Sequence, residues 1–173
     1  MRLLLFCSAV KEIAPEYNDA ARSIVRAACG KGYEIVSGGT IKGTMGVVCD
    51  EASKCGARVI GILPRFMKGL EHPGLTSLEW TDTMSERKEK MREGADLVVA
   101  LPGGIGTMDE LFETMVLSKL GRFGGRIAVY NPGGFYDLLE ELLDHFVATN
   151  MLKQEHKDLV RFCSSVEEVT ALL

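Results

Sequence analysis

The apolar positions of this chain form short, almost unbroken runs, separated by longer segments in which apolar residues recur with helical spacing. Short apolar runs without strict alternation are typical of strands that are covered on both faces of a sheet. We predict strands over Arg2–Cys7, Tyr33–Ser37, Arg58–Leu63, Asp96–Leu101, Arg126–Tyr130 and Arg161–Cys163.

Two of the intervening segments carry an amphipathic stripe. One stripe contains Tyr17, Ala20, Ala21, Ile24 and Ala28, after a proline suited to a first helical turn and before two glycines that end the helix. The other contains Phe135, Leu138, Leu139, Leu142 and Phe146. The alternation of strands and helices predicts an α/β fold, with a Rossmann-like, doubly wound, mostly parallel sheet and helices on both faces. No linker or repeat divides the chain, so residues 1–173 are predicted to form a single Rossmann-like nucleotide-binding domain.

The composition indicates a globular protein and argues against a nucleic-acid-binding or membrane-spanning one. A chain of 173 residues with 46% hydrophobic and 25% charged residues is ordinary for a globular protein, and a net charge of −4 argues against a general nucleic-acid binder. No apolar run approaches the roughly 20 residues that span a bilayer. The five cysteines form no Cys-x-x-Cys pair and the three histidines no metal-spaced pair. We therefore expect a cytoplasmic location, no metal and no cofactor.

A glycine-rich segment follows the predicted strand at Asp96–Leu101 and reads Leu101-Pro102-Gly103-Gly104-Ile105-Gly106-Thr107-Met108-Asp109-Glu110. Glycines before a helix let the backbone approach a ligand, and the helix N-terminus favours a phosphate. It is neither a P-loop nor a GxGxxG fingerprint, which argues against an NAD-dependent oxidoreductase. Thr107-x-x-Glu110 also fits a capping box, so a purely structural interpretation stays open at this point.

Two further segments complete the pattern. Ser37–Gly46 is a second glycine-rich junction after a strand, and Asp82–Gly94 is a highly charged helix. That helix contains Arg87 and Lys88, which suit a phosphate, but with Glu86 and Lys90 four residues apart it also fits a solvated charged helix. An anion-binding loop, a carboxylate and an arginine together suit cleavage at the anomeric carbon of a sugar phosphate, which has an oxocarbenium-like transition state.

The combined motifs resemble the LOG ("Lonely Guy") family of cytokinin riboside 5′-monophosphate phosphoribohydrolases, whose members have often been labelled lysine decarboxylases. The PGGIGTMDE segment matches the family's PGGxGTxxE, and Asp82–Lys88 is similar to its DTMHERK segment. His72–Leu78 resembles its HxGLTEL stretch, and the resemblance continues to Asn131-Pro132-Gly133-Gly134-Phe135-Tyr136.

The resemblance implies a hydrolase that releases an adenine-type base and ribose 5-phosphate from AMP or an N6-substituted AMP, in a homodimer. It implies Arg87 and Glu110 as the catalytic residues. The implied substrate-binding residues are Ser8, Gly39, Met84, Lys88, Gly103, Gly104, Ile105, Gly106 and Thr107. No nucleic acid or membrane is implied as a partner.

The chain departs from the family pattern at several positions. The family's CGSS turn reads Cys7-Ser8-Ala9-Val10, and Thr40 replaces the third glycine of GGGxxGxMG. Ser85 replaces a histidine, Val116 a threonine, and Glu71 is displaced from an acidic position. Both catalytic positions remain, which favours the enzyme. The altered turn keeps open the alternative of a non-hydrolytic nucleotide or molybdenum-cofactor carrier.

Overall fold

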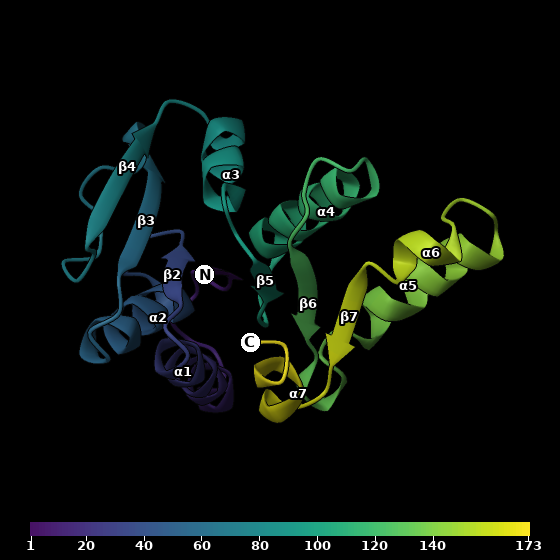
Figure 1. Ribbon diagram of the computed structural model, residues 1–173, viewed down its shortest axis with the longest axis horizontal. Coiled ribbons are helices and arrows are strands. Elements are labelled where there is room, and N and C mark those ends of the chain that lie inside the picture. Colours follow the sequence, from purple (N-terminus) through teal and green to yellow (C-terminus); the bar gives the residue numbers. More distant parts are fainter.

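The computed structural model describes residues 1–173 and contains one sheet with seven strands. The strands are β1 (Arg2–Phe6), β2 (Glu34–Ser37), β3 (Val59–Pro64), β4 (Ser77–Thr81), β5 (Leu97–Ala100), β6 (Arg126–Tyr130) and β7 (Val160–Cys163). Their order is β4-β3-β2-β1-β5-β6-β7, and every neighbouring pair is parallel (Figure 1). The predicted α/β fold with a parallel, doubly wound sheet is confirmed.

Helices cover both faces of the sheet. On one face lie α1 (Pro15–Gly30), α2 (Gly43–Lys54) and the short α7 (Val166–Thr170). On the other lie α3 (Met84–Arg92), α4 (Ile105–Lys119) and α5 (Asp137–Ala148), and α5 is followed by the one-turn α6 (Gln154–Lys157). Figure 1 shows α1, α2 and α7 below the sheet and α3 and α4 above it. None of these helices combines the length and the apolar character that a membrane crossing requires.

All six predicted strands are present, with ends that differ by at most one residue, but β4 was missed. Its sequence, Ser77-Leu78-Glu79-Trp80-Thr81, alternates polar and apolar residues, and it pairs with β3 alone at the edge of the sheet. An edge strand is only partly covered, so it lacks the continuous apolar run by which the other strands were recognised.

Two separate cores form because alternate residues of each strand point to opposite faces. In β1, Leu3 and Leu5 pack with the α1 residue Ile24, whereas Leu4 and Phe6 belong to the core beneath α3, α4 and α5. The stripe predicted for α1 is confirmed, because its alanines and Ile24 are buried.

The stripe predicted for α5 is wrong in part. The buried face of this region contains Tyr136, Leu139 and Leu143, while Leu138 is 80% exposed and Leu142 is also exposed. Since α5 has apolar residues on two adjacent faces, helical periodicity alone does not select the one that meets the sheet.

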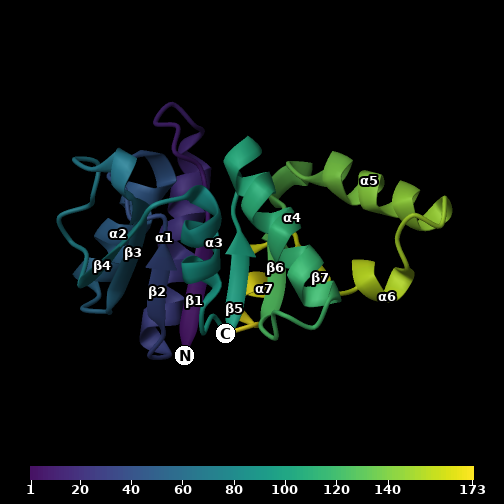
Figure 2. The ribbon, with the colours of Figure 1, turned by 90° about the horizontal axis from the view of Figure 1, so that it is seen from above.

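The strand order reverses between β1 and β5, which are neighbours at the centre of the sheet: β2 to β4 are added on one side of β1, and β5 to β7 on the other. The helix after β1 covers one face and the helix after β5 covers the other. The carboxyl ends of these two strands therefore mark a topological switch point, where open α/β sheets have their ligand crevice. Figure 2, which shows the strands running upward, places the start of α4 directly after β5 at this edge.

Candidate active site

The start of α3 is defined by a cap. The Thr83 hydroxyl accepts a hydrogen bond from the Glu86 amide at 3.1 Å, and the Glu86 carboxylate accepts one from the Asp82 amide at 2.9 Å. This near-reciprocal pair resembles the capping box that the sequence suggested for Thr107 and Glu110. It fixes where α3 begins, and therefore the direction in which Arg87 leaves the helix.

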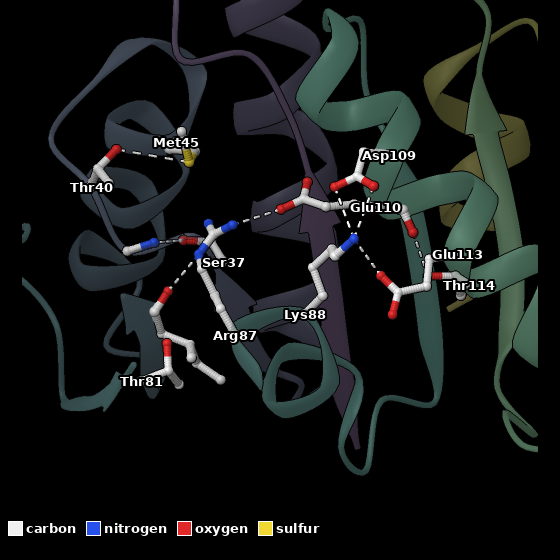
Figure 3. A network of polar contacts seen from close by, with 12 residues as sticks. Ser37, Thr40, Met45, Thr81, Arg87, Lys88, Asp109, Glu110, Glu113 and Thr114 are labelled. Carbon is white, nitrogen blue, oxygen red and sulfur yellow. Dashed lines mark hydrogen bonds and ion pairs between the residues drawn. The ribbon is translucent and has the colours of Figure 1, made fainter. Parts of the chain in front are cut away.

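Arg87 crosses the carboxyl edge of the sheet from α3 to α4 (Figure 3). Its Nε donates to the Ile62 carbonyl oxygen of β3 at 3.0 Å, and its Nη1 donates to Glu110 Oε1 at 3.0 Å. Arg87 is only 6% exposed. Because the guanidinium is planar, two such bonds in different directions fix its position and orientation.

Gly38, at the end of β2, leaves the space that the guanidinium occupies. A Cβ atom at this position would lie 2.4 Å from Arg87 Nη2 and 2.5 Å from Met45 Sδ. Any larger residue would displace one of these side chains. Sequence analysis selected the neighbouring Gly39 and missed Gly38, since both belong to one glycine run and only the fold brings Arg87 against it.

Glu110 is buried, with 8% of its surface exposed. Burial raises the pKa of its carboxyl group above the usual range, and the Arg87 guanidinium opposes this rise without cancelling it. The Cys7 thiol lies in the same environment; burial, and then the Glu110 charge, raise its pKa well above the usual value, so Cys7 stays a neutral thiol. The Arg87–Glu110 pair thus consists of a carboxyl group with increased proton affinity beside a cation in a fixed position.

The capping interpretation of Thr107 and Glu110 is wrong. Gly104 is the N-cap of α4, which begins at Ile105, so Thr107 lies inside the first turn. The Glu110 side chain bonds to Arg87 instead of a backbone amide. Tertiary structure supplies the partner that a local capping pattern would otherwise provide.

Lys88 lies between two carboxylates of α4 (Figure 3). Its Nζ is 2.9 Å from both Asp109 carboxylate oxygens and 2.6 Å from Glu113 Oε2. Partial burial lowers the pKa of the ammonium group, but the bonds to Glu113 and Asp109 raise it overall. The structure thus places Lys88 in an ion network with α4.

The solvated-helix interpretation of α3 is also wrong, because Arg87, Met91 and Arg92 are buried. Arg92 Nη2 lies 2.9 Å from Glu113 Oε1 and extends the contact between α3 and α4. Lys90 pairs with Glu93 and more distantly with Glu79, and the expected pair with Glu86 is not formed. The sequence showed the charges on α3 but did not show that their partners lie on α4.

The glycine-rich segment brings the N-terminus of α4 to the same edge of the sheet. The first intrahelical bond runs from the Met108 amide to the Gly104 carbonyl, so the amides of the first turn have no partner within the helix. Ile105 is 89% exposed, and no atom lies within 4 Å of a Cβ placed at Gly104 or Gly106. Gly104, Ile105 and Gly106 are therefore exposed at the start of the helix that carries Glu110, and helix N-termini of this kind favour an anion.

Gly103 has a different environment from the other glycines of the segment. Its amide donates to the Tyr136 hydroxyl at 3.0 Å, so this donor already has a partner. A Cβ at Gly103 would lie 2.1 Å from the hydroxyl oxygen of the buried Thr107. Gly103 is therefore required for close packing of the loop on Thr107, and Tyr136 joins the site as a residue that sequence analysis did not select.

The remaining predicted binding residues lie around the same edge. The Ser8 hydroxyl accepts a bond from the Val10 amide at 3.0 Å, so Ser8 shapes its own turn. Gly39 has a φ of +71°, and a Cβ there would lie 2.5 Å from Leu63 Cδ1. Met84, the first residue of α3, is exposed.

Comparisons with known proteins identify relatives of this chain. Residues 45–173 match the family model described as "Possible lysine decarboxylase". A cytokinin riboside 5′-monophosphate phosphoribohydrolase of Mycobacterium tuberculosis is 33% identical over 147 residues, which cover 84% of this chain and 78% of that protein. The chain belongs to the LOG family. An enzyme of the same name from Rhodococcoides fascians is 29% identical over 98% of this chain and 87% of its own length.

Solved structures show the same fold at lower identity. The molybdenum cofactor binding protein of Rippkaea orientalis has a TM-score of 0.74 and 20% identity, covering 99% of this chain and 93% of that chain. At this identity the likeness concerns the fold alone. For this LOG-family chain, the arrangement of Arg87, Glu110 and the start of α4 must therefore carry the functional argument.

Gly103 and Gly106 should differ sharply in their tolerance of a side chain. Gly103→Ala should lower the free energy of unfolding by about 1–3 kcal/mol, because its Cβ would overlap Thr107. Gly106→Ala, the matched control inside the first turn of α4, should not lower it, since the space there is open and alanine favours a helix more than glycine does. Urea unfolding of both variants measures the difference, and equal losses would contradict the packing argument.

Proposed function

We propose that this protein hydrolyses the N-glycosidic bond of adenosine-type nucleoside 5′-monophosphates, AMP or N6-substituted AMP, to a free base and ribose 5-phosphate. The observation that carries the proposal is the buried Arg87–Glu110 pair at the N-terminus of α4, with one carboxylate oxygen bonded to the guanidinium. The printed names of the relatives describe the same class of reaction, a riboside 5′-monophosphate phosphoribohydrolase.

The chemistry assigned to Glu110 follows from its position. Its Oε1 accepts the bond from Arg87, and Oε2 accepts none from the protein. Beside the anomeric carbon, a carboxylate stabilises the positive charge that develops as the bond to the base breaks. The electron pair of that bond leaves with the base, and water attacks the anomeric carbon. Glu110 accepts a proton from the water, and this proton passes to the departing base, which leaves neutral.

Arg87 keeps Glu110 in a productive form. Burial alone favours the protonated carboxyl group, which would neither stabilise a cation nor accept a proton. The guanidinium lowers the carboxyl pKa and holds the group against rotation through its second bond to Ile62. We assign two effects to Arg87: it orients Glu110, and it keeps Glu110 ionised where that carboxylate meets the substrate.

The 5′-phosphate is assigned to the amides of Gly104, Ile105, Gly106 and Thr107. They begin a helix of 15 residues, whose dipole favours an anion at this end. Lys88 is engaged by Asp109 and Glu113, so we assign it an indirect role in nucleotide binding, through the position of α3 against α4. Ser8, Gly39 and Met84 stay predicted contacts around the nucleotide.

We also propose that the protein is a homodimer. Ile105 and Val116 are exposed apolar residues of α4, Leu120 is exposed directly after its end, and Leu138 is exposed on α5. Large exposed apolar surfaces are commonly covered by another protein. Sedimentation equilibrium should give twice the mass of the chain, and Val116→Glu combined with Leu138→Glu should give the mass of one chain. A monomeric unmutated protein would overturn this proposal.

Glu110→Gln should lower kcat by about 10²-fold or more, because an amide stabilises neither the cation nor a proton in transfer. Nucleotide binding should change little. Since burial raises the pKa of Glu110, activity of the unmutated protein should fall with decreasing pH at values above the ~4.3 of a free glutamate. Glu89→Gln, an exposed position on α3, is the matched control and should leave kcat unchanged. Near-normal turnover in Glu110→Gln would remove Glu110 from the mechanism.

The substrate class is tested by comparing AMP with adenosine. Without the phosphate, the α4 amides stay unpaired in the transition state, at a cost of several kcal/mol. The value of kcat/KM for adenosine should therefore be at least about 10²-fold lower, measured by chromatography of released adenine. Similar values for both would indicate a nucleoside hydrolase. Release of no base from any nucleoside monophosphate would favour a carrier.

A further inference from the structure

The Tyr136 hydroxyl bridges the two residues on either side of Pro102. It accepts a hydrogen bond from the Gly103 amide at 3.0 Å and donates one to the Leu101 carbonyl oxygen at 2.8 Å. Tyr136 is 5% exposed, and burial raises the pKa of its hydroxyl well above the usual value. The hydroxyl therefore keeps the proton that it donates to Leu101 over the whole working range of pH.

Tyr136 is itself held by the end of the neighbouring strand. Its amide donates to Asn131 Oδ1 at 2.6 Å, and Asn131 Nδ2 donates to Asp137 Oδ1 at 2.8 Å. The Tyr136 ring meets the Phe135 ring edge to face at a centroid distance of 4.7 Å. These contacts link β6 to the loop that follows β5, its neighbour in the sheet.

The loop has few other restraints. The Leu101 amide bonds to the Phe6 carbonyl, and the next backbone amide of this stretch with a backbone acceptor is that of Met108. Between them lie Pro102, which has no N–H, and three glycines, which have the greatest backbone freedom of any residue. The direction of the first α4 amides therefore depends on how this segment is held at its ends.

We propose that Tyr136 is a positioning residue, whose hydroxyl fixes the Pro102–Gly104 segment so that the first amides of α4 face the 5′-phosphate of the substrate. This role rests on the proposed function, because it assigns those amides to a phosphate. Tyr136 acts through the loop and does not touch the substrate. The same bond occupies the Gly103 amide. Sequence analysis placed Gly103 among the substrate-binding residues, but its amide already donates to Tyr136.

The test is Tyr136→Phe, which keeps the ring and removes the hydroxyl. Tyr33→Phe is the matched control: Tyr33 is 2% exposed, and its hydroxyl donates to the Leu173 carbonyl at 3.3 Å in the opposite core. Binding of ribose 5-phosphate is measured by calorimetry, kcat/KM is measured for AMP and adenosine, and thermal melting reports stability.

For Tyr136→Phe we expect Kd for ribose 5-phosphate to rise about tenfold and kcat/KM for AMP to fall about 10- to 100-fold, the scale of a small misplacement of binding groups. The value for adenosine should change by less than about twofold, so discrimination between the two substrates falls. Tyr33→Phe should leave both binding and discrimination unchanged, even where its melting temperature drops.

A milder variant covers the case in which Tyr136→Phe does not fold. Asp137→Ala, at an exposed position, releases Asn131 and so loosens Tyr136 without entering the core. It should shift the same quantities in the same direction, by about threefold. Unchanged phosphate affinity and discrimination in the folded variants would overturn the role of Tyr136.

Failure of the proposed function gives a different result. A protein that binds ribose 5-phosphate but releases no base is not a phosphoribohydrolase, and the binding data for Tyr136→Phe still decide the positioning role. A protein that does not bind ribose 5-phosphate at all has no phosphate site at α4, and both proposals fall together.

Discussion

The ion pair between Arg87 and Glu110 is the interaction on which the rest of this site depends. It joins α3 to α4 across the carboxyl edge of the sheet, and a second bond of Arg87, to the Ile62 carbonyl, extends it to β3. Burying two charges costs free energy that their attraction often does not recover. The raised pKa of Glu110 shows that Arg87 does not fully offset burial of the carboxyl group. The proposed catalytic role accounts for a pair with this balance, and Gly38 provides the space that it needs.

The position of α3 follows from charge as much as from apolar packing. Met91 is its buried apolar side chain, while Lys88 and Arg92 reach Asp109 and Glu113 on α4. Like Arg87, both residues reach side chains of α4, so these contacts help to set the separation of the two helices at which Arg87 meets Glu110. Lys88, which the sequence suggested as a phosphate contact, has its charge balanced by α4 in the folded protein.

The loop before α4 combines close packing with freedom of the backbone. Gly103 admits the Thr107 side chain, and Gly104 leaves the helix N-terminus open. Glycine alone would leave this segment mobile. The Tyr136 hydroxyl and the buried Thr107 restrain it, so the loop gains order from a residue 33 positions away in the chain. A phosphate site of this kind depends on such restraint because the amides must be oriented before the ligand arrives.

Sequence by itself determined the fold class and selected Arg87 and Glu110, which the structure joins at the candidate site. Continuous apolar runs identified all strands covered on both faces, and the glycine-rich segment after β5 marked the start of α4, because both signals arise from local backbone and burial requirements. The edge strand β4 and the buried face of α5 were not determined, since partial covering and two apolar faces give ambiguous patterns. Only the tertiary structure decided that Glu110 pairs with Arg87 instead of capping a helix, that Lys88 is bound by Asp109 and Glu113, and that Tyr136 occupies the Gly103 amide. Each of these contacts joins residues that are more than 20 positions apart, and no spacing within one element encodes such a partner.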